Sequence, residues 1–170
     1  MQTNQFRHSL WEFSLALYAQ PGVAETCLAL QNDHGVNVNI LLWCAWLGSS
    51  GYLLDPESLA QAQVLIGDWS SHYIVPLRAL RVQMKAEFGV SDTGIEAVRT
   101  AIKQAELQAE KEALSWLERY AQTCPLTIAT DANKAALTNI NLYLINNAVP
   151  THNAATELIA AALSAIDRHN

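Results

Sequence analysis

Apolar residues recur every three or four positions along almost the whole chain. Such spacing places them on one face of a helix, and no stretch alternates between apolar and polar residues for long enough to indicate a sheet. The pattern therefore predicts an all-α fold, a compact multi-helix bundle of about seven or eight helices with no sheet. The expected helices cover residues 9–19, 23–31, 37–49, 55–73, 76–88, 92–123, 131–148 and 153–166.

One expected helix, from Asn37 to Ser49, is apolar on almost every side. A helix that is hydrophobic all round belongs in the interior of a protein, so we expect it at the centre of the bundle. The longest expected helix, 92–123, is amphipathic, with alternating acidic and basic residues on its exposed side. It is predicted to lie along one side of the bundle.

Proline and turn residues set the predicted boundaries. Asp55, Pro56 and Glu57 are an N-cap, a first-turn proline and a first-turn acid, which together begin a helix. Val75 precedes Pro76, and a residue before proline is pushed out of the helical region, so a break is predicted there. No repeat and no linker rich in Pro, Gly or Ser divides the chain, which predicts one helical domain over residues 1–170.

Composition describes a core-rich chain with an acidic balance. Hydrophobic residues make up 51% and charged residues 15%, with a net charge of −6. General nucleic-acid binding is disfavoured because its affinity comes from neutralising phosphates. The N-terminal segment lacks the features of a signal peptide, and the longest apolar run, Ile40 to Leu47, is far shorter than the roughly 20 residues that span a bilayer. We expect a cytoplasmic protein without membrane contact.

The chain lacks the signatures of common catalytic and metal sites. It contains no Cys-x-x-Cys, His-Glu-x-x-His, Gly-x-Ser-x-Gly or phosphate loop. We therefore predict no metal, no cofactor and no catalytic residue, which favours a non-enzymatic protein. Three widely separated cysteines, Cys27, Cys44 and Cys124, stand in apolar surroundings, as reduced structural cysteines do.

The only concentrated positive charge lies on the helix expected to begin at Pro76. Arg78, Arg81 and Lys85 stand at positions i, i+3 and i+7, so their side chains share one helix face. Arginine side chains recognise carboxylates and phosphates through two parallel hydrogen bonds. The pattern therefore indicates a binding site for a small anion or for an acidic protein partner.

Aromatic residues are expected beside this basic face, and acids of the long helix are possible partners for it. Trp69, His72 and Tyr73 lie in the preceding turn and are expected to form a stacking wall beside it. The alternative is that the bases pair with acids such as Glu106 and Glu110 of the long helix and join two helices. Charges on helix surfaces are usually solvated or paired, which favours this structural alternative.

Asparagines define a second candidate site. Asn37 is placed to cap the central helix, and Asn39 follows in its first turn. A cap together with a buried structural hydrogen bond is the simpler interpretation, because buried amides are normally satisfied. The other interpretation is an interhelical ligand pocket that these two residues form with Asn141, which belongs to an asparagine-rich helix.

Two stretches of the chain resemble a proteobacterial family of short conserved hypothetical proteins, the domain of unknown function 2390. The first stretch comprises Trp11-Glu12-Phe13-Ser14, Tyr18, Pro21-Gly22-Val23, Cys27 to Gln31, Gly35 to Leu42 and Trp46-Leu47; the second comprises Trp69, Val75 to Leu77, Arg78, Arg81 and Lys85. The resemblance covers roughly the first two thirds of the chain. It implies a bacterial, cytoplasmic, single-domain protein and brings no known activity.

These observations give three functional hypotheses. The first is an interaction or regulatory module whose basic helix face binds an acidic partner or a small anion. The second is a small-molecule carrier or enzyme whose interhelical pocket is lined by asparagines and aromatic residues. The third concerns assembly, a homodimer in which the apolar side of the long helix pairs with itself.

Overall fold

The computed structural model describes residues 6–150 and 152–167, and most of them are helical. The elements, in chain order, are α1 (Leu10–Tyr18), α2 (Val23–His34), α3 (Val38–Ser49), β1 (Tyr52–Leu54), α4 (Pro56–Trp69), the π-helical turn η1 (Ser70–Ile74), α5 (Val75–Phe88), α6 (Thr93–Ala121), β2 (Leu126–Ile128), α7 (Ala132–Asn146) and α8 (His152–Asp167). The predicted all-α class is confirmed.

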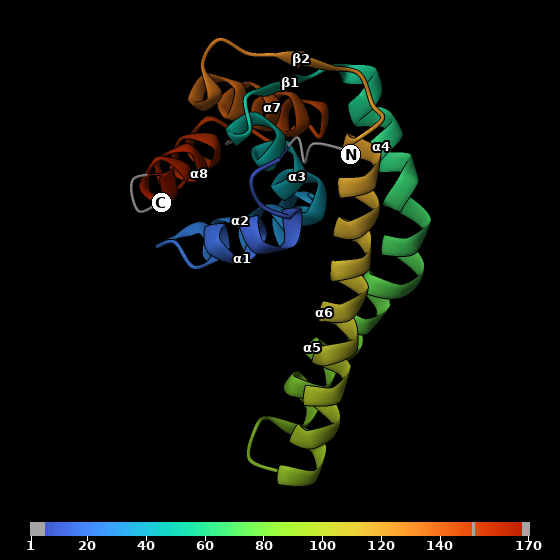
Figure 1. The fold of residues 1–170 in the computed structure, drawn as a ribbon. Coiled ribbons are helices and arrows are strands. Elements are labelled where there is room, and N and C mark those ends of the chain that lie inside the picture. The colour runs from blue at the N-terminus through green and yellow to red at the C-terminus, as the bar shows by residue number, and fades with distance from the viewer. Residues whose placement is uncertain (1–5, 151, 168–170) are drawn as a thin grey trace.

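The helices form a body and a projecting arm (Figure 1). Helices α1, α2, α3, α7 and α8 make the body, and α4 runs beside the C-terminal half of α6. We define the arm as α5 together with residues 93–105 of α6. Helix α5 has no buried residue, and the first buried residue of α6 is Glu106, so the arm packs mainly within itself. The sequence did not predict this projection.

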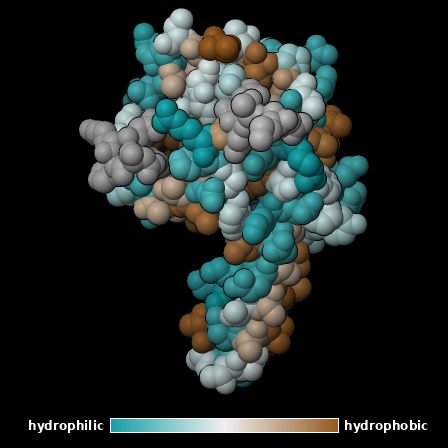
Figure 2. All heavy atoms as spheres, viewed as in Figure 1, coloured by the Kyte–Doolittle hydropathy of each residue, from teal (hydrophilic) through white to brown (hydrophobic). Residues whose placement is uncertain are grey.

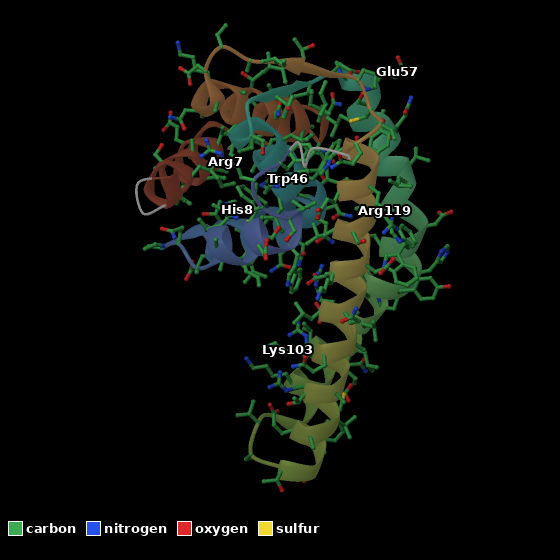
Figure 3. The ribbon with its side chains drawn as sticks, viewed as in Figure 1. Arg7, His8, Trp46, Glu57, Lys103 and Arg119 are labelled. Carbon is green, nitrogen blue, oxygen red and sulfur yellow. The ribbon has the colours of Figure 1, made fainter. Side chains whose placement is uncertain are left out.

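Helix α3 is the most buried element, as predicted from its apolar character. Every residue from Val38 to Gly48 is buried. Helices α1, α6 and α7 contact it from different sides, so it occupies the centre of the body (Figure 1). The indole nitrogen of Trp46 donates to the carbonyl of His8 over 3.1 Å and fixes the segment before α1 on this core (Figure 3).

Helices α3 and α7 approach so closely that their backbones touch. A Cβ atom added at Gly48 would lie 2.2 Å from the Cα atom of Ala136 and 2.4 Å from its nitrogen. A glycine on one helix and alanines on the other allow this approach, because no side chain separates the two backbones. The core therefore depends on small residues at one crossing point.

A short antiparallel ribbon corrects the prediction of no sheet. Strand β1 pairs with β2, with Tyr52 opposite Ile128 and Leu54 opposite Leu126. The buried Asn139 side chain holds β1 on the body, since its Oδ1 accepts from the Leu54 amide over 2.9 Å and its Nδ2 donates to the Tyr52 carbonyl over 2.9 Å. Strands of three residues are too short to show an alternating pattern in the sequence.

The predicted break at Val75 and Pro76 is wrong, because α4 continues into α5 through η1. The Val75 amide donates to the Ser70 carbonyl, five residues earlier, which closes a π-helical turn. This wider turn comes directly before Pro76, which has no amide hydrogen to donate. The chain thus passes the proline without leaving the helix.

Several helices begin with a side-chain cap at or next to the start predicted from the sequence. The side chains of Asn37, Asp55, Asp92 and Asp131 each accept a hydrogen bond from a backbone amide in the first turn of their helix. Each cap satisfies an amide that has no partner within the helix. Local chemistry therefore fixes where α3, α4, α6 and α7 start.

We predict that Gly48→Ala lowers the free energy of unfolding by about 3 kcal/mol or more, because the new methyl group meets backbone atoms that cannot rotate away. Urea titration followed by circular dichroism measures this change. Gly67→Ala is the matched control, since a Cβ at helical Gly67 meets nothing within 4 Å, and we expect it to be neutral or stabilising by up to about 1 kcal/mol. Equal stability of the two variants would contradict the packing described.

Candidate functional site

A cavity of about 410 Å³ lies where the arm leaves the body, and we name it the elbow pocket. Its walls come from the end of α2, the N-terminus of α3, the turn η1, the start of α5 and one residue of α6. The residues that line it are Gln31, Asn32, Gly35, Val36, Asn37, Val38, Asn39, Ser70, Ile74, Val75, Arg78 and Glu110. Members of both sequence-predicted sites therefore meet in one pocket.

Asn37 holds three elements together at the edge of this pocket. Its Oδ1 accepts from the Asn39 amide over 3.0 Å, which caps α3, and its Nδ2 donates to Ser70 Oγ over 2.9 Å. The backbone amide of Asn37 donates to the hydroxyl of Tyr143 over 2.9 Å. Burial raises the pKa of this tyrosine, so the hydroxyl stays protonated. Asn37 is therefore the cap expected from the sequence, and it positions the turn η1.

Asn39 has a buried side chain without a protein partner. The residue is 7% exposed, and its side-chain amide makes no hydrogen bond with any residue that the structure describes. The prediction of a buried structural hydrogen bond at this position is wrong for the described residues. The donor and the acceptor of Asn39 are open to solvent, and Asn39 lines both the elbow pocket and an adjoining hollow of about 140 Å³ that also includes Glu110.

The arginines of the basic face turn inward to α6. Arg78 Nε lies 2.9 Å from Glu106 Oε1, and Arg78 Nη2 lies 2.5 Å from Glu110 Oε1. Arg81 Nε lies 2.6 Å from Glu106 Oε2. The structural alternative of the sequence analysis is thus correct for both arginines, whereas Lys85 is exposed and makes no ion pair within residues 6–150 and 152–167.

The two acids of this network are unequally compensated. Burial by itself raises the pKa of Glu106, but the hydrogen bonds and charges of Arg81 and Arg78 outweigh it and leave the pKa below its ordinary value of 4.5. Burial also raises the pKa of Glu110, and Arg78 only partly offsets this effect. Glu110 is therefore the acid with less compensating positive charge, and it is the one that lines the elbow pocket.

The aromatic wall expected beside the basic face does not line the pocket. The indole nitrogen of Trp69 donates to the Ala109 carbonyl over 2.9 Å, and its ring packs 5.2 Å from that of Trp116. Trp69 therefore joins α4 to α6. His72 is exposed and contacts only the ring of Tyr73 among the described aromatic residues.

Asn141 also lies outside the pocket that it was expected to share with Asn37 and Asn39. Its Oδ1 accepts from Thr156 Oγ1 over 2.7 Å, so it joins α7 to α8. Of the residues that line the pocket, only Asn37, Asn39 and Arg78 were predicted as ligand contacts, so Ser70 and Glu110 are among those that the sequence did not indicate. Ser70 carries no signal in the sequence, and Glu110 was considered only as a partner for the arginines.

The face of the arm beneath the body is polar and continues the pocket. A smaller neighbouring hollow, about 180 Å³, shares Gln31, Val38, Arg78 and Glu110 with the elbow pocket. It is also lined by Tyr18, Leu28, Arg81, Lys103, Glu106 and Leu107. Figure 3 shows Lys103 on the arm, below the body. In Figure 2, hydrophilic residues gather on this side of the arm and hydrophobic residues run along its opposite edge.

The described residues show no metal cluster, no disulfide and no membrane-spanning helix. No group of three or more His, Cys, Asp or Glu side chains is arranged to hold a metal ion within the described part of the chain. Cys27 and Cys44 are buried and free, and burial raises the pKa of Cys27 to about 11. None of the helices described has both the length and the apolar character needed to cross a membrane.

The fold and the pocket define an all-helical protein with a polar cavity between its helices. A family model described as "Protein of unknown function (DUF2390)" matches residues 9–117, and the chain belongs to this family. All residues that line the elbow pocket fall within the matched stretch. No curated protein and no solved structure gives a significant match to the chain.

We predict that the stabilities of Glu106→Gln and Glu110→Gln, each relative to the natural protein, change in opposite directions with pH. Because the pKa of Glu106 is lowered by folding, its stabilisation is present above pH 4.5 and is lost as the pH falls through the folded-state pKa. We expect Glu106→Gln to be about 2 kcal/mol less stable at neutral pH, because two arginines lose the negative charge and one of the two acceptor oxygens of the carboxylate. The difference in stability between Glu106→Gln and the natural protein becomes smaller at acid pH, where Glu106 is protonated.

Glu110 has the opposite sign, since folding raises its pKa. Its carboxyl favours the folded state below pH 4.5, and that contribution is lost as the pH rises through the folded-state pKa. The stability of Glu110→Gln relative to the natural protein should therefore improve over this rise. Chemical unfolding between pH 3.5 and 8 measures both variants, and parallel curves for the two would contradict the unequal compensation.

Proposed function

We propose that this protein is a non-enzymatic binding module that takes a small anion in the elbow pocket. The observation that carries the proposal is the side-chain amide of Asn39, which has no hydrogen-bond partner among the described residues and lines the same cavity as Arg78. Its nitrogen and oxygen are not sealed off by the protein, so a ligand in the cavity can reach both of them. This pocket combines the basic residue of the first hypothesis with the interhelical cavity of the second.

The hydrogen-bond donors of the pocket favour a negatively charged group on the ligand. The N-terminus of α3 opens on it, and the partial positive charge of a helix N-terminus attracts anions. Arg78 adds a full positive charge, and its Nη1 makes no hydrogen bond to a described residue. Asn39 supplies a neutral donor between these groups. Together these donors suit a carboxylate or a similar small anion.

The same geometry favours a small ligand over an acidic protein partner. The side chains of Arg78 and Arg81 are only 22% and 25% exposed, because they face Glu106 and Glu110 across the arm. A flat acidic surface cannot reach them without displacing those pairs. A small molecule inside the cavity reaches Arg78 from the side. The cavity volume of about 410 Å³ is also within the range of small-molecule sites.

The pocket residues support binding rather than catalysis. The lining contains no histidine or cysteine, and the hydroxyl oxygen of Ser70 accepts from Asn37. Arg78 and Glu110 lie at the base of the arm, and Asn37 and Asn39 belong to the body. A ligand held between them joins the two parts and favours one arrangement of the arm. This coupling suits a regulatory role for the module.

The proposal is tested by isothermal titration of the full chain with 4-methylpentanoate, succinate and inorganic phosphate. We expect at least one of these anions to bind, and Arg78→Gln to weaken that binding by about tenfold or more, because a charge-assisted hydrogen bond is lost. Arg81→Gln is the matched control. It removes a comparable contact with Glu106, and Arg81 lines the neighbouring hollow but not the elbow pocket.

Binding that is equally weakened in both variants would place the effect in the ion-pair network and contradict a contact with Arg78. Absence of binding by all three anions and by the amino acid named below would reject the binding module itself.

A further inference from the structure

We infer that the ligand of the elbow pocket is an α-amino acid with an aliphatic side chain, whose carboxylate contacts Arg78 and Asn39 and whose ammonium group contacts Glu110. This inference rests on the proposed binding function and specifies its ligand class. It follows from the distribution of charge, from the spacing of the charged groups and from the apolar part of the lining.

The distribution of charge calls for a cation beside Glu110. Glu106 accepts hydrogen bonds from Arg78 and from two nitrogens of Arg81, whereas Glu110 accepts only from Arg78, through Oε1. Oε2 of Glu110 receives no hydrogen bond from any residue within the described ranges. A purely anionic ligand would add repulsion at this carboxylate. A ligand that also carries an ammonium group supplies the missing partner.

The spacing of the charged groups limits how far apart the charges of the ligand stand. Arg78 Nη2 and Glu110 Oε1 are 2.5 Å apart, so the positive and negative groups of the pocket are immediate neighbours. A ligand that contacts both must carry its own opposite charges side by side. In an α-amino acid the ammonium nitrogen and the carboxylate are attached to the same carbon. An amino acid with its amine at the far end of the chain does not meet this requirement.

Asn39 suits the same ligand because its side chain both donates and accepts. Its Nδ2 has hydrogens for a carboxylate, and its Oδ1 has lone pairs for an ammonium group. Asn39 lies in the first turn of α3 and lines the same cavity as Arg78 and Glu110. A ligand with both charges therefore satisfies each end of this amide, whereas a simple anion satisfies only one.

The remaining wall of the pocket is mostly aliphatic. Val36, Val38, Ile74 and Val75 line it, and Val36 and Ile74 are each 2% exposed. Burying apolar surface of the ligand against these side chains is favourable. A charged side chain on the ligand would meet no opposite charge on this wall. The pocket therefore favours an aliphatic amino acid.

Three probes of one carbon skeleton test the inference on the full chain by isothermal titration. L-Leucine has both charges, 4-methylpentanoate lacks the amine, and 3-methylbutylamine lacks the carboxylate. We expect leucine to bind roughly tenfold or more tightly than either analogue, because each analogue loses one charge-assisted contact. 6-Aminohexanoate, which has its charges at opposite ends, should bind no more tightly than 4-methylpentanoate. Leucine binding no tighter than 4-methylpentanoate would overturn the inference while leaving the binding of anions intact.

Glu110→Gln provides a second test, because glutamine keeps the shape of the side chain and removes its charge. Leucine should bind roughly tenfold more weakly to this variant, and 4-methylpentanoate should bind more tightly because a repulsion is lost. Glu112→Gln is the control, since Glu112 lies on the same helix and contacts Trp116 instead of the pocket. Circular dichroism checks that each variant is folded. Unchanged leucine binding by folded Glu110→Gln would overturn the contact with the ammonium group.

Discussion

Helix α3 must be covered on every side, and this requirement organises the rest of the molecule. Its residues from Val38 to Gly48 are all buried, so neighbouring helices have to supply apolar surface around its whole circumference. At one end the α7 backbone contacts Gly48 directly. At the other end the polar N-terminus of a buried helix needs partners inside the protein. Asn37 supplies one of them and also binds Ser70 and Tyr143. The elbow pocket lies beside this junction, where the amide of Asn39 has no such partner.

The ion-pair network at the base of the arm determines how the basic face is used. Arg78 and Arg81 satisfy the buried Glu106, so most of their charge serves to join α5 to α6. A buried carboxylate without these arginines would be costly to keep ionised. Arg78 nevertheless extends to Glu110 and to the pocket, and this second contact leaves a polar site between the body and the arm. The network thus has a structural part around Glu106 and a part around Glu110 that is available to a ligand.

This division explains why two separate hypotheses from the sequence meet in one place. The basic face suggested an anion site, and the asparagines suggested an interhelical pocket. In the structure Arg78 comes from the first set and Asn37 and Asn39 from the second, while Trp69 and Asn141 serve contacts between helices elsewhere. The family match covers the residues of the pocket and stops before α7 and α8. The proposed binding function therefore concerns the part of the chain that defines the family.

The sequence by itself determined the helical class, the caps that begin α3, α4, α6 and α7, and the burial of α3, because these depend on periodicity and on chemistry within a few residues. It also suggested that Arg78 and Arg81 pair with acids of the long helix. Only the tertiary structure decided that α4 continues past Pro76, that the arm projects, and that Glu110 is left with less positive charge than Glu106. These features depend on which helices lie next to one another. The tertiary structure also decided that the amide of Asn39 has no partner, because the hydrogen bonds of a side chain depend on neighbours that are distant in sequence.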